Sequence, residues 1–296
     1  MGHLLGGAER RYASMKELTA QGYGIKDLCE TLEVSRSGYH AFCHRGKSQR
    51  LEENVRILQE MEALFLSSRK TYGSPRMKAA LNQAGFVCGK NRVARLMRKH
   101  GLCAVKKRRY RPRTTNSNHD YPIAQNHWAE RKPAVKPNEV WLSDITYVDT
   151  LEGWLYLAGV MDACSRKIVG WGMDQQMPME LTSGAFQQAV ERQNPSEGLL
   201  HHSDRGSQYA SGGYRTLLED HGVIASMSRA GNCYDNAMME SFWGTLKTEC
   251  FQGVVPETRQ QARQMIFEYI EVFYNRQRLH SSLGYQSPVD FENKLN

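Results

Sequence analysis

Three acidic residues are spaced so that a mixed α/β fold would bring them to one point. Asp144 comes at the end of the apolar run 140–143, and Asp204 follows the apolar run 198–202. Glu240 lies early in a segment with a helical pattern, and 35 residues separate it from Asp204. Two carboxylates at strand ends and a third on a nearby helix converge only if the strands share one sheet. This spacing restricts the fold more than any compositional feature does.

A cluster of three carboxylates suits phosphodiester chemistry. Such reactions use two divalent metal ions about 3.5–4 Å apart to hold the attacking and leaving oxygens. Hard cations such as Mg²⁺ take carboxylate oxygens as ligands and keep positions for water and phosphate. Each acid taken alone also has an ordinary interpretation, because an Asp at a strand end often closes a turn and a Glu on a helix is usually solvated. The joint pattern favours a metal site.

The residues around these acids carry a family resemblance. The sequence reads WLSDITYV around Asp144, HSDRGSQY around Asp204 and NCYDNAMMESFWGTLKTE around Glu240. These motifs resemble those of the DDE transposases and retroviral integrases. Among these proteins, they most resemble the second-frame protein of insertion-sequence-three-type elements. The resemblance extends from about Tyr72 to Phe291 and includes a closing signature, matched by Tyr274, Asn275, Arg278, His280, Leu283, Gly284 and Pro288. It implies an α/β ribonuclease-H-like (integrase-type) catalytic core, preceded by an all-α helix-turn-helix-type DNA-binding region.

The charge is distributed unevenly along the 296 residues. Residues 1–135 hold 26 Lys and Arg against 11 Asp and Glu, whereas residues 136–296 hold 13 against 20. A basic N-terminal part joined to an acidic C-terminal part suggests an N-terminal arm that binds a polyanion and a C-terminal domain that binds cations. Basic excess that serves only solubility is the alternative. We predict the segments 1–48 (helix-turn-helix-like), 49–105 (a second such unit), 106–136 (basic linker), 137–255 (catalytic core) and 256–296 (C-terminal helix and closing loop on the core).

Two helical units are expected before the core. In the first, Ser35 would cap a short second helix that presents Arg36, Ser37, Tyr39 and His40 to a DNA groove. A plain helical hairpin inside a larger domain fits the same pattern. In the second, Ser74 would cap a helix with Pro75 in its first turn. A basic helix over 91–100 follows, with Val93, Leu96 and Met97 toward a core.

Cations that face outward are candidate DNA contacts. Those of the basic helix would bind phosphates, or form a solvated face: Arg92, Arg95, Arg98 and Lys99. Those of the linker would follow a phosphate backbone, although basic linkers also occur without a ligand: Lys106, Lys107, Arg108, Arg109, Arg111 and Arg113. Lys247 lies two turns after Glu240, so it faces the same way and either holds a phosphate beside the metals or is a surface cation. Asn232 and Asn236 would contact DNA or order the start of the Glu240 helix, which Asp235 would cap.

The pattern of the core predicts three consecutive strands over 139–148, 154–161 and 167–173, followed by a helix over 181–193. A strand over 199–202, a helix over 214–221, a strand over 223–227 and the Glu240 helix come next. Asp162 would close the turn between the second and third strands, with a fourth metal ligand as the alternative. Gly206, Gln208 and Tyr209 would shape the loop beside the metals. A helix over 257–274 leads into the closing loop, where we expect His280 to pack on the core.

Cysteine usage and hydropathy bear on the compartment. The seven cysteines form no C-x-x-C pair, so neither a disulfide framework nor a zinc finger is indicated. No apolar run approaches the ~20 residues that cross a bilayer, and the first residues lack the apolar stretch of a signal peptide. We therefore expect no membrane association and a location in the bacterial cytoplasm or nucleoid.

The resemblance implies a DNA transposase. Asp144, Asp204 and Glu240 would hold two Mg²⁺, for which Mn²⁺ can substitute, and would cut and join DNA at the ends of an insertion sequence. Double-stranded DNA of the element ends and of the target would be the partner, with a homo-oligomer on paired ends and a first-frame partner protein or fusion. Two alternatives stay open: a ribonuclease-H-like nuclease that only hydrolyses, and a DNA-binding regulator with an inactive core. Strand transfer between donor and target duplexes separates the three.

Overall fold

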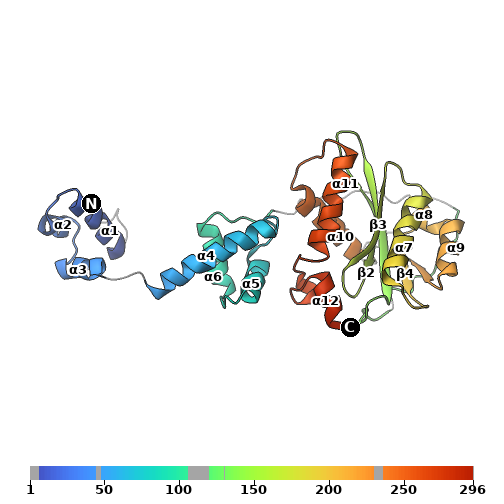
Figure 1. Ribbon diagram of the computed structural model, residues 1–296, viewed down its shortest axis with the longest axis horizontal. Coiled ribbons are helices and arrows are strands. Elements are labelled where there is room, and N and C mark those ends of the chain that lie inside the picture. Colours follow the sequence, from blue (N-terminus) through green and yellow to red (C-terminus); the bar gives the residue numbers. More distant parts are fainter. Residues whose placement is uncertain (1–6, 45–47, 106–119, 130, 230–235, 296) are drawn as a thin grey trace. The chain divides into compact units, whose positions relative to one another are not determined.

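The computed structural model describes residues 7–44, 48–105, 120–129, 131–229 and 236–295 (Figure 1). They fall into two compact units, Met1–Glu60 and Met61–Asn296, and the division lies inside one long helix, α4 (Gln49–Ser67). The six cysteines in these ranges are free thiols, as their spacing predicts. Within the same ranges, no helix has both the length and the apolar character needed to span a bilayer.

The first unit begins with three short helices, α1 (Ala8–Ala20), α2 (Ile25–Thr31) and α3 (Arg36–His44). They pack around Met15, Leu28 and Tyr39. The backbone N–H of Gly38 donates to Oγ of Ser35 at 3.1 Å, which confirms the predicted helix cap.

The predicted presentation of Tyr39 to a DNA groove is wrong. Its ring is buried, and its hydroxyl donates to Oγ1 of Thr19 at 3.3 Å. The reason is that α1 supplies a third helix, which covers the inner face of α3. Three of the four residues expected at that surface remain exposed: Arg36, Ser37 and His40.

The second unit opens with a helical region, in which α5 (Ser74–Gln83) and α6 (Lys90–Lys99) follow the end of α4. Val93, Leu96 and Met97 are buried, as the apolar spacing predicts. The predicted cap at Ser74 is wrong, because Ser74 is already helical and Gly73 occupies the capping position without a side chain to contribute. Pro75 does lie in the first turn, where its missing N–H costs no helix hydrogen bond.

Within the second unit, five strands form one sheet with the order β3-β2-β1-β4-β5. Strand β2 is antiparallel to β1 and β3, whereas β4 and β5 run parallel to β1. The strands are β1 (Val140–Val148), β2 (Leu155–Asp162), β3 (Ile168–Asp174), β4 (Leu200–Ser203) and β5 (Ile224–Met227). Three consecutive antiparallel strands followed by two parallel ones confirm the predicted ribonuclease-H-like fold.

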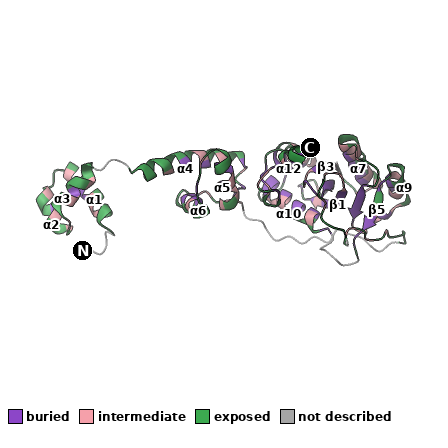
Figure 2. Ribbon diagram, turned by 90° about the horizontal axis from the view of Figure 1, so that it is seen from below, coloured by how far each residue is buried: buried purple, intermediate pink, exposed green. Residues whose placement is uncertain are grey.

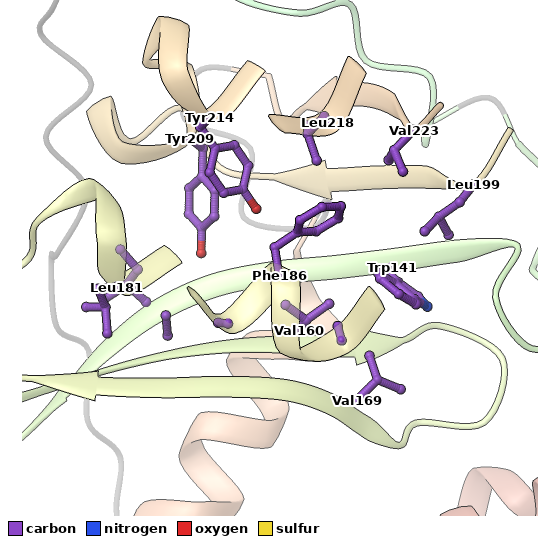
Figure 3. Packing of buried hydrophobic residues seen from close by; sticks show 14 of the residues in the cluster. Trp141, Val160, Val169, Leu181, Phe186, Leu199, Tyr209, Tyr214, Leu218 and Val223 are labelled. Atoms are coloured by element: carbon purple, nitrogen blue, oxygen red, sulfur yellow. The ribbon is translucent and has the colours of Figure 1, made fainter. Parts of the chain in front are cut away.

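Helices cover both faces of this sheet (Figure 1). On one face lie α7 (Met179–Gln193), α8 (Ser207–Ala210) and α9 (Gly212–Asp220), and on the other lie α10 (Ala237–Phe251) and α11 (Arg259–Phe267). Strands β1, β2 and β4 are accordingly buried along most of their length (Figure 2). Figure 3 shows Phe186 of α7 between Trp141 of β1 and Tyr214 of α9, at the centre of the core. Gly170 lets α7 approach β3, since a Cβ there would collide with the carbonyl oxygen of Ala185.

Asp162 closes the β2–β3 turn, which confirms the turn interpretation over that of a metal ligand. Its buried Oδ1 accepts from the backbone N–H groups of Cys164 and Ser165 at 3.0 and 2.7 Å, and its Oδ2 accepts from the N–H of Asn138.

The C-terminal segment follows α11 with a π-helical stretch, Glu268–Tyr274, and ends in α12 (Pro288–Leu295). The predicted helix over 257–274 therefore changes its hydrogen-bond pattern partway. Asn275 then bonds both backbone groups of Ile168 on edge strand β3, at 2.9 and 3.0 Å. His280 pairs its backbone with Gln286, and burial lowers its pKa to about 4.

Buried polar contacts tie the helical region of the second unit to this C-terminal segment. The Tyr72 hydroxyl donates to the carbonyl of Gln277 at 3.2 Å and accepts from the N–H of Leu279 at 2.8 Å. Nearby, Arg278 makes a two-pronged ion pair with the buried Glu249, with both distances 2.7 Å. Two-pronged charge-assisted bonds fix geometry strongly, and Arg76 of α5 forms an ion pair with the same Glu249 at 3.8 Å, which ties α5 to α10.

Candidate active site

Asp144 and Asp204 are brought together by the sheet register. In the parallel pair β1–β4, Val140 faces Leu200 and Leu142 faces His202. Continuing that register by two residues sets Asp144 opposite Asp204, just beyond the last paired position. Because the alternation of a strand repeats every two residues, both positions then fall on the same side of the sheet as Leu142 and His202. The two acids therefore meet where β1 and β4 diverge.

Asp144 is held by donors from two elements. Its Oδ1 accepts from the N–H of Ile145 at 2.9 Å, and its Oδ2 accepts from Nε1–H of Trp243 on α10 at 3.0 Å. Gly159, directly opposite on β2, makes room for that indole, since a Cβ there would lie 2.8 Å from the Trp243 ring. The carboxylate is thus fixed by a strand, a helix and a glycine.

The pKa of Asp144 is affected by the charges of both Asp204 and Glu240. Burial and then the negative charge of Asp204 raise the pKa of Asp144 well above its usual range. Glu240 adds a smaller effect in the same direction, and the N–H groups of Ile145 and Trp243 oppose both. The charge of Asp204 therefore affects the pKa of Asp144 more than the charge of Glu240 does.

Asp204 opens a tight loop. Its Oδ1 accepts from the N–H of Gly206 at 2.9 Å, and a Cβ on Gly206 would lie 3.0 Å from that oxygen. Gln208 donates to the carbonyl of Met177, and Tyr209 is buried beneath the acids, so both shape this loop as expected.

Glu240 lies in the first turn of α10 and is exposed. Partial burial raises its pKa. Asn236 precedes the helix, is buried, and donates from Nδ2 to the carbonyl of Ser143 at 3.3 Å. Of its two expected roles, ordering the helix start is the one that this contact supports. Asn232 and the predicted cap Asp235 lie outside the described residues.

The residues present fit a hard divalent cation. All three are carboxylates, the ligand type that Mg²⁺ prefers, and a cation would offset the repulsion that raises the pKa of Asp144. Across the described ranges, however, no group of three His, Cys, Asp or Glu side chains is already arranged to hold a metal ion. The acids are close enough to interact but do not form a closed coordination set.

Comparisons with known proteins place this geometry in a family. Residues 134–233 and 240–295 match two descriptions of an "Integrase core domain", and residues 52–110 match an "HTH-like domain". The transposase InsF for insertion sequence IS3A of Escherichia coli K12 is 39% identical over 276 residues, covering 92% of this chain and 95% of that protein. The chain belongs to the IS3 family of transposases.

Further relatives agree. The transposase for insertion sequence element IS904 of Lactococcus lactis is 43% identical over 249 residues, which cover 84% of this chain and 98% of the relative. The insertion element IS600 uncharacterized 31 kDa protein of Shigella sonnei is 46% identical over 267 residues, covering 90% and 98%. Among solved structures, the HTLV-2 integrase catalytic core domain in complex with magnesium is similar with a TM-score of 0.42 and 14% identity, over 53% of this chain and 98% of that one. The integrase core and HTH-like matches and the transposase relatives, rather than this structural likeness, show the chain to be a DDE-type transposase that acts on DNA.

Lys247 of the transposase is not an ordinary solvated lysine. Its Nζ lies 4.7 Å from the centre of the Tyr147 ring, a cation–π contact. Burial lowers its pKa to about 8, and the negative charges of Asp149 and Asp144 oppose that shift. The side chain of Lys247 thus lies close enough to Asp144 for that charge to affect its pKa.

The other predicted DNA contacts divide into two groups. On α6, Arg95, Arg98 and Lys99 are exposed and Arg92 is half-buried. The six linker cations between 106 and 113 lie outside the described residues.

Sequence reasoning missed three residues of the site: Trp243, Gly159 and Tyr147. Trp243 stands three residues after Glu240, so its spacing could have placed it beside the acid on the same helix face. Gly159 and Tyr147 gave no such signal, because their roles depend on contacts with α10 that only the folded sheet creates.

Proposed function

We propose that Asp144, Asp204 and Glu240 are the catalytic carboxylates of this transposase and that they hold two divalent cations, Mg²⁺ in the cell, for which Mn²⁺ can substitute. The observation that carries this is the β1–β4 register, which sets Asp144 opposite Asp204. The combined effect of Asp204 and Glu240 on the pKa of Asp144 supports the third member. When bound, two such ions activate a water and stabilise the attacking and leaving oxygens of an in-line displacement.

The protein's own residues would orient that chemistry. Ile145 and Trp243 each occupy one acceptor position of Asp144, on Oδ1 and Oδ2, which leaves one lone pair on each oxygen for a cation. Glu240 approaches from α10, whose start is tied to Ser143 through Asn236. Outer partners of this kind keep ligand carboxylates in one orientation.

DNA would be held by cations on both sides of the acids. Lys247 would contact a phosphate near the reacting bond, and the exposed cations of α6 with those of 106–113 would hold the duplex farther away. Water would attack a phosphodiester at the element's end, and the freed 3′-hydroxyl would then attack a second phosphodiester. No Ser or Tyr nucleophile is required.

The assembly would follow the expectations from the resemblance. The transposase would act as a homo-oligomer on paired element ends, together with a first-frame partner or as a fusion to it, in the bacterial cytoplasm. The segments 1–48, 49–105 and 106–136 would form the DNA-binding arm, followed by the core 137–255 and the closing segment 256–296.

Strand transfer between donor and target duplexes tests the proposal. We expect Asp144→Asn, Asp204→Asn and Glu240→Gln each to remove both cleavage and joining while duplex binding persists. Asp220→Asn, an exposed acid at the end of α9, is the matched control and should behave like the parent. A nuclease that only hydrolyses would cleave without joining, and a regulator with an inactive core would bind without cleaving. Either result would contradict the proposal.

A further inference from the structure

An aromatic platform lies at the turn of the β1–β2 hairpin and consists of Tyr147, Trp154 and Tyr156. The rings of Tyr147 and Trp154 are stacked, with their centres 4.7 Å apart and their planes 17° from parallel. Tyr156 meets Trp154 edge-on at 6.3 Å. Despite these two neighbours, Trp154 keeps 52% of its surface exposed. A large apolar ring with one stacked face and half of its area in solvent is unusual for a residue whose only role is packing.

The turn that carries Trp154 is firmly held. Thr150 and Gly153 exchange backbone hydrogen bonds, and Gly153 has a φ of +106°, which a side chain would strain. The N–H of Leu151 donates to the carbonyl of Pro256 at 3.0 Å, and Nε–H of Arg259 donates to the carbonyl of Trp154 at 3.0 Å. An exposed ring on an anchored turn loses little conformational freedom when a ligand stacks on it.

The platform is joined to the acids by the same elements. Tyr147 follows Asp144 by three residues on β1, about 10 Å along the strand, and starts from the opposite side of the sheet because side chains alternate along a strand. Lys247 packs its ammonium on the Tyr147 ring and stands on the helix that carries Glu240.

Charge suits a nucleotide at this place. Lys247 lies over the Tyr147 ring, and the guanidinium of Arg259 binds the backbone carbonyl of Trp154, so two cations lie near the platform. Asp149 and Glu152 are also nearby, but Glu152 already accepts from the N–H of Arg259 at 2.8 Å. A neutral base on the ring, with its phosphates at the flanking cations, satisfies both the apolar and the charged parts.

We propose that the exposed surface of Trp154 stacks with an unpaired nucleobase of the DNA strand that is bound at Asp144, Asp204 and Glu240. The base must be unpaired because the faces of bases inside a duplex are covered by their neighbours, whereas every unstacked base offers a face to an aromatic ring. The platform thus favours DNA with a frayed or single-stranded end next to the reacting phosphodiester. This inference rests on the proposed function, since it locates the base relative to the acids of that site.

Binding of the full chain to two probes tests the inference. One probe is a blunt duplex, and the other is the same duplex with a short single-stranded overhang at one end. Affinities are measured in the presence of EDTA, so that no chemistry occurs. We expect the parent to prefer the overhang by about tenfold, the typical effect of one base stacked on one aromatic ring. Trp154→Ala should remove this preference, and Trp154→Tyr should keep most of it.

Phe267→Ala is the matched control, because Phe267 is also 52% exposed but packs edge-on against Trp171 of β3 at the far end of α11. It should retain the parent's preference. Equal overhang preference in Trp154→Ala and the parent, or no preference in the parent, overturns the inference. A parent that prefers the overhang but shows no metal-dependent strand transfer would instead contradict the proposed function, so the two failures are distinguishable.

Discussion

Asp144 and Asp204 are positioned by a backbone ladder, whereas Glu240 and Lys247 are positioned by the packing of a single helix. The β1–β4 register sets the strands that carry the two aspartates, and its last pair, Leu142 and His202, lies two residues before the acids. The position of Glu240 depends on α10, which contacts the sheet through side chains such as Trp243. The weaker effect of Glu240 on the pKa of Asp144 agrees with this difference. The site is thus a fixed pair with an adjustable third member.

The link between the fixed and adjustable parts is the Trp243–Asp144 hydrogen bond. Trp243→Phe keeps a ring but removes the N–H donor. Because outer partners of ligand carboxylates typically contribute 10–100-fold, we expect strand transfer to fall by about 10–100-fold with little change in thermal stability. Trp171→Phe, which removes an indole donor to Glu271 away from the acids, is the control and should leave joining unchanged. Equal activity of the two variants would show that Asp144 needs no support from α10.

On the adjustable side, Lys247 separates a cation that binds DNA from one that only packs on Tyr147. Lys247→Ala should weaken binding of DNA by about tenfold, the usual effect of one charge-assisted contact. Lys247→Arg should recover much of this loss, and Lys247→Glu should be worse than Ala. Gel-shift titrations at constant salt measure the series. If the Ala and Glu variants bind as the parent does, the contact with Tyr147 is the whole role of this lysine.

A larger side chain at Gly159 tests whether the close packing of α10 on the sheet is needed. Gly159→Ala places a Cβ 2.8 Å from the Trp243 ring, and overpacking of this kind costs about 1–3 kcal/mol. We expect a lower free energy of unfolding in denaturant and reduced joining. Gly184→Ala on α7, where a Cβ meets nothing within 4 Å, should be neutral or stabilising. A Gly159 variant that is as stable as the parent would mean that α10 shifts freely.

The strands beneath the acids predict a pH dependence of stability. His201 on β4 is buried between Ser143 and Tyr214, and burial lowers its pKa to about 3. A depressed histidine pKa means that the unfolded chain takes up the proton first, so stability should fall as pH drops from about 6.5 toward 3, by about 1.4 kcal/mol per pH unit.

The raised pKa of Asp144 acts in the opposite direction in metal-free protein, because its contribution to stability is present at low pH and is lost as pH rises. Thermal melts of the parent, His201→Gln and the exposed control His221→Gln across this range measure the first effect. An unchanged slope in His201→Gln would contradict it.

The acids could be predicted from the sequence because the motifs around them match those of a family. The apolar runs also marked the strands that carry the two aspartates. The order of strands followed from the same runs, and the turn at Asp162 from the chemistry of that residue. What could not be predicted depends on contacts distant in sequence. Trp243 and Asp144 are 99 residues apart, and Tyr39 is buried because α1 covers it. From the local sequence, Ser74 could either cap α5 or be its first residue. In the structure it is the first residue, and Gly73 is the cap.

Binding of Mn²⁺ to the full chain, followed by the loss of the free-ion signal in electron paramagnetic resonance, tests the central claim most directly. The account predicts that the parent binds Mn²⁺ in the presence of DNA, that Asp144→Asn and Asp204→Asn abolish this binding, and that Glu240→Gln weakens it. The control Asp220→Asn should bind as the parent does. Undiminished Mn²⁺ binding in either aspartate variant would contradict the assignment of the site.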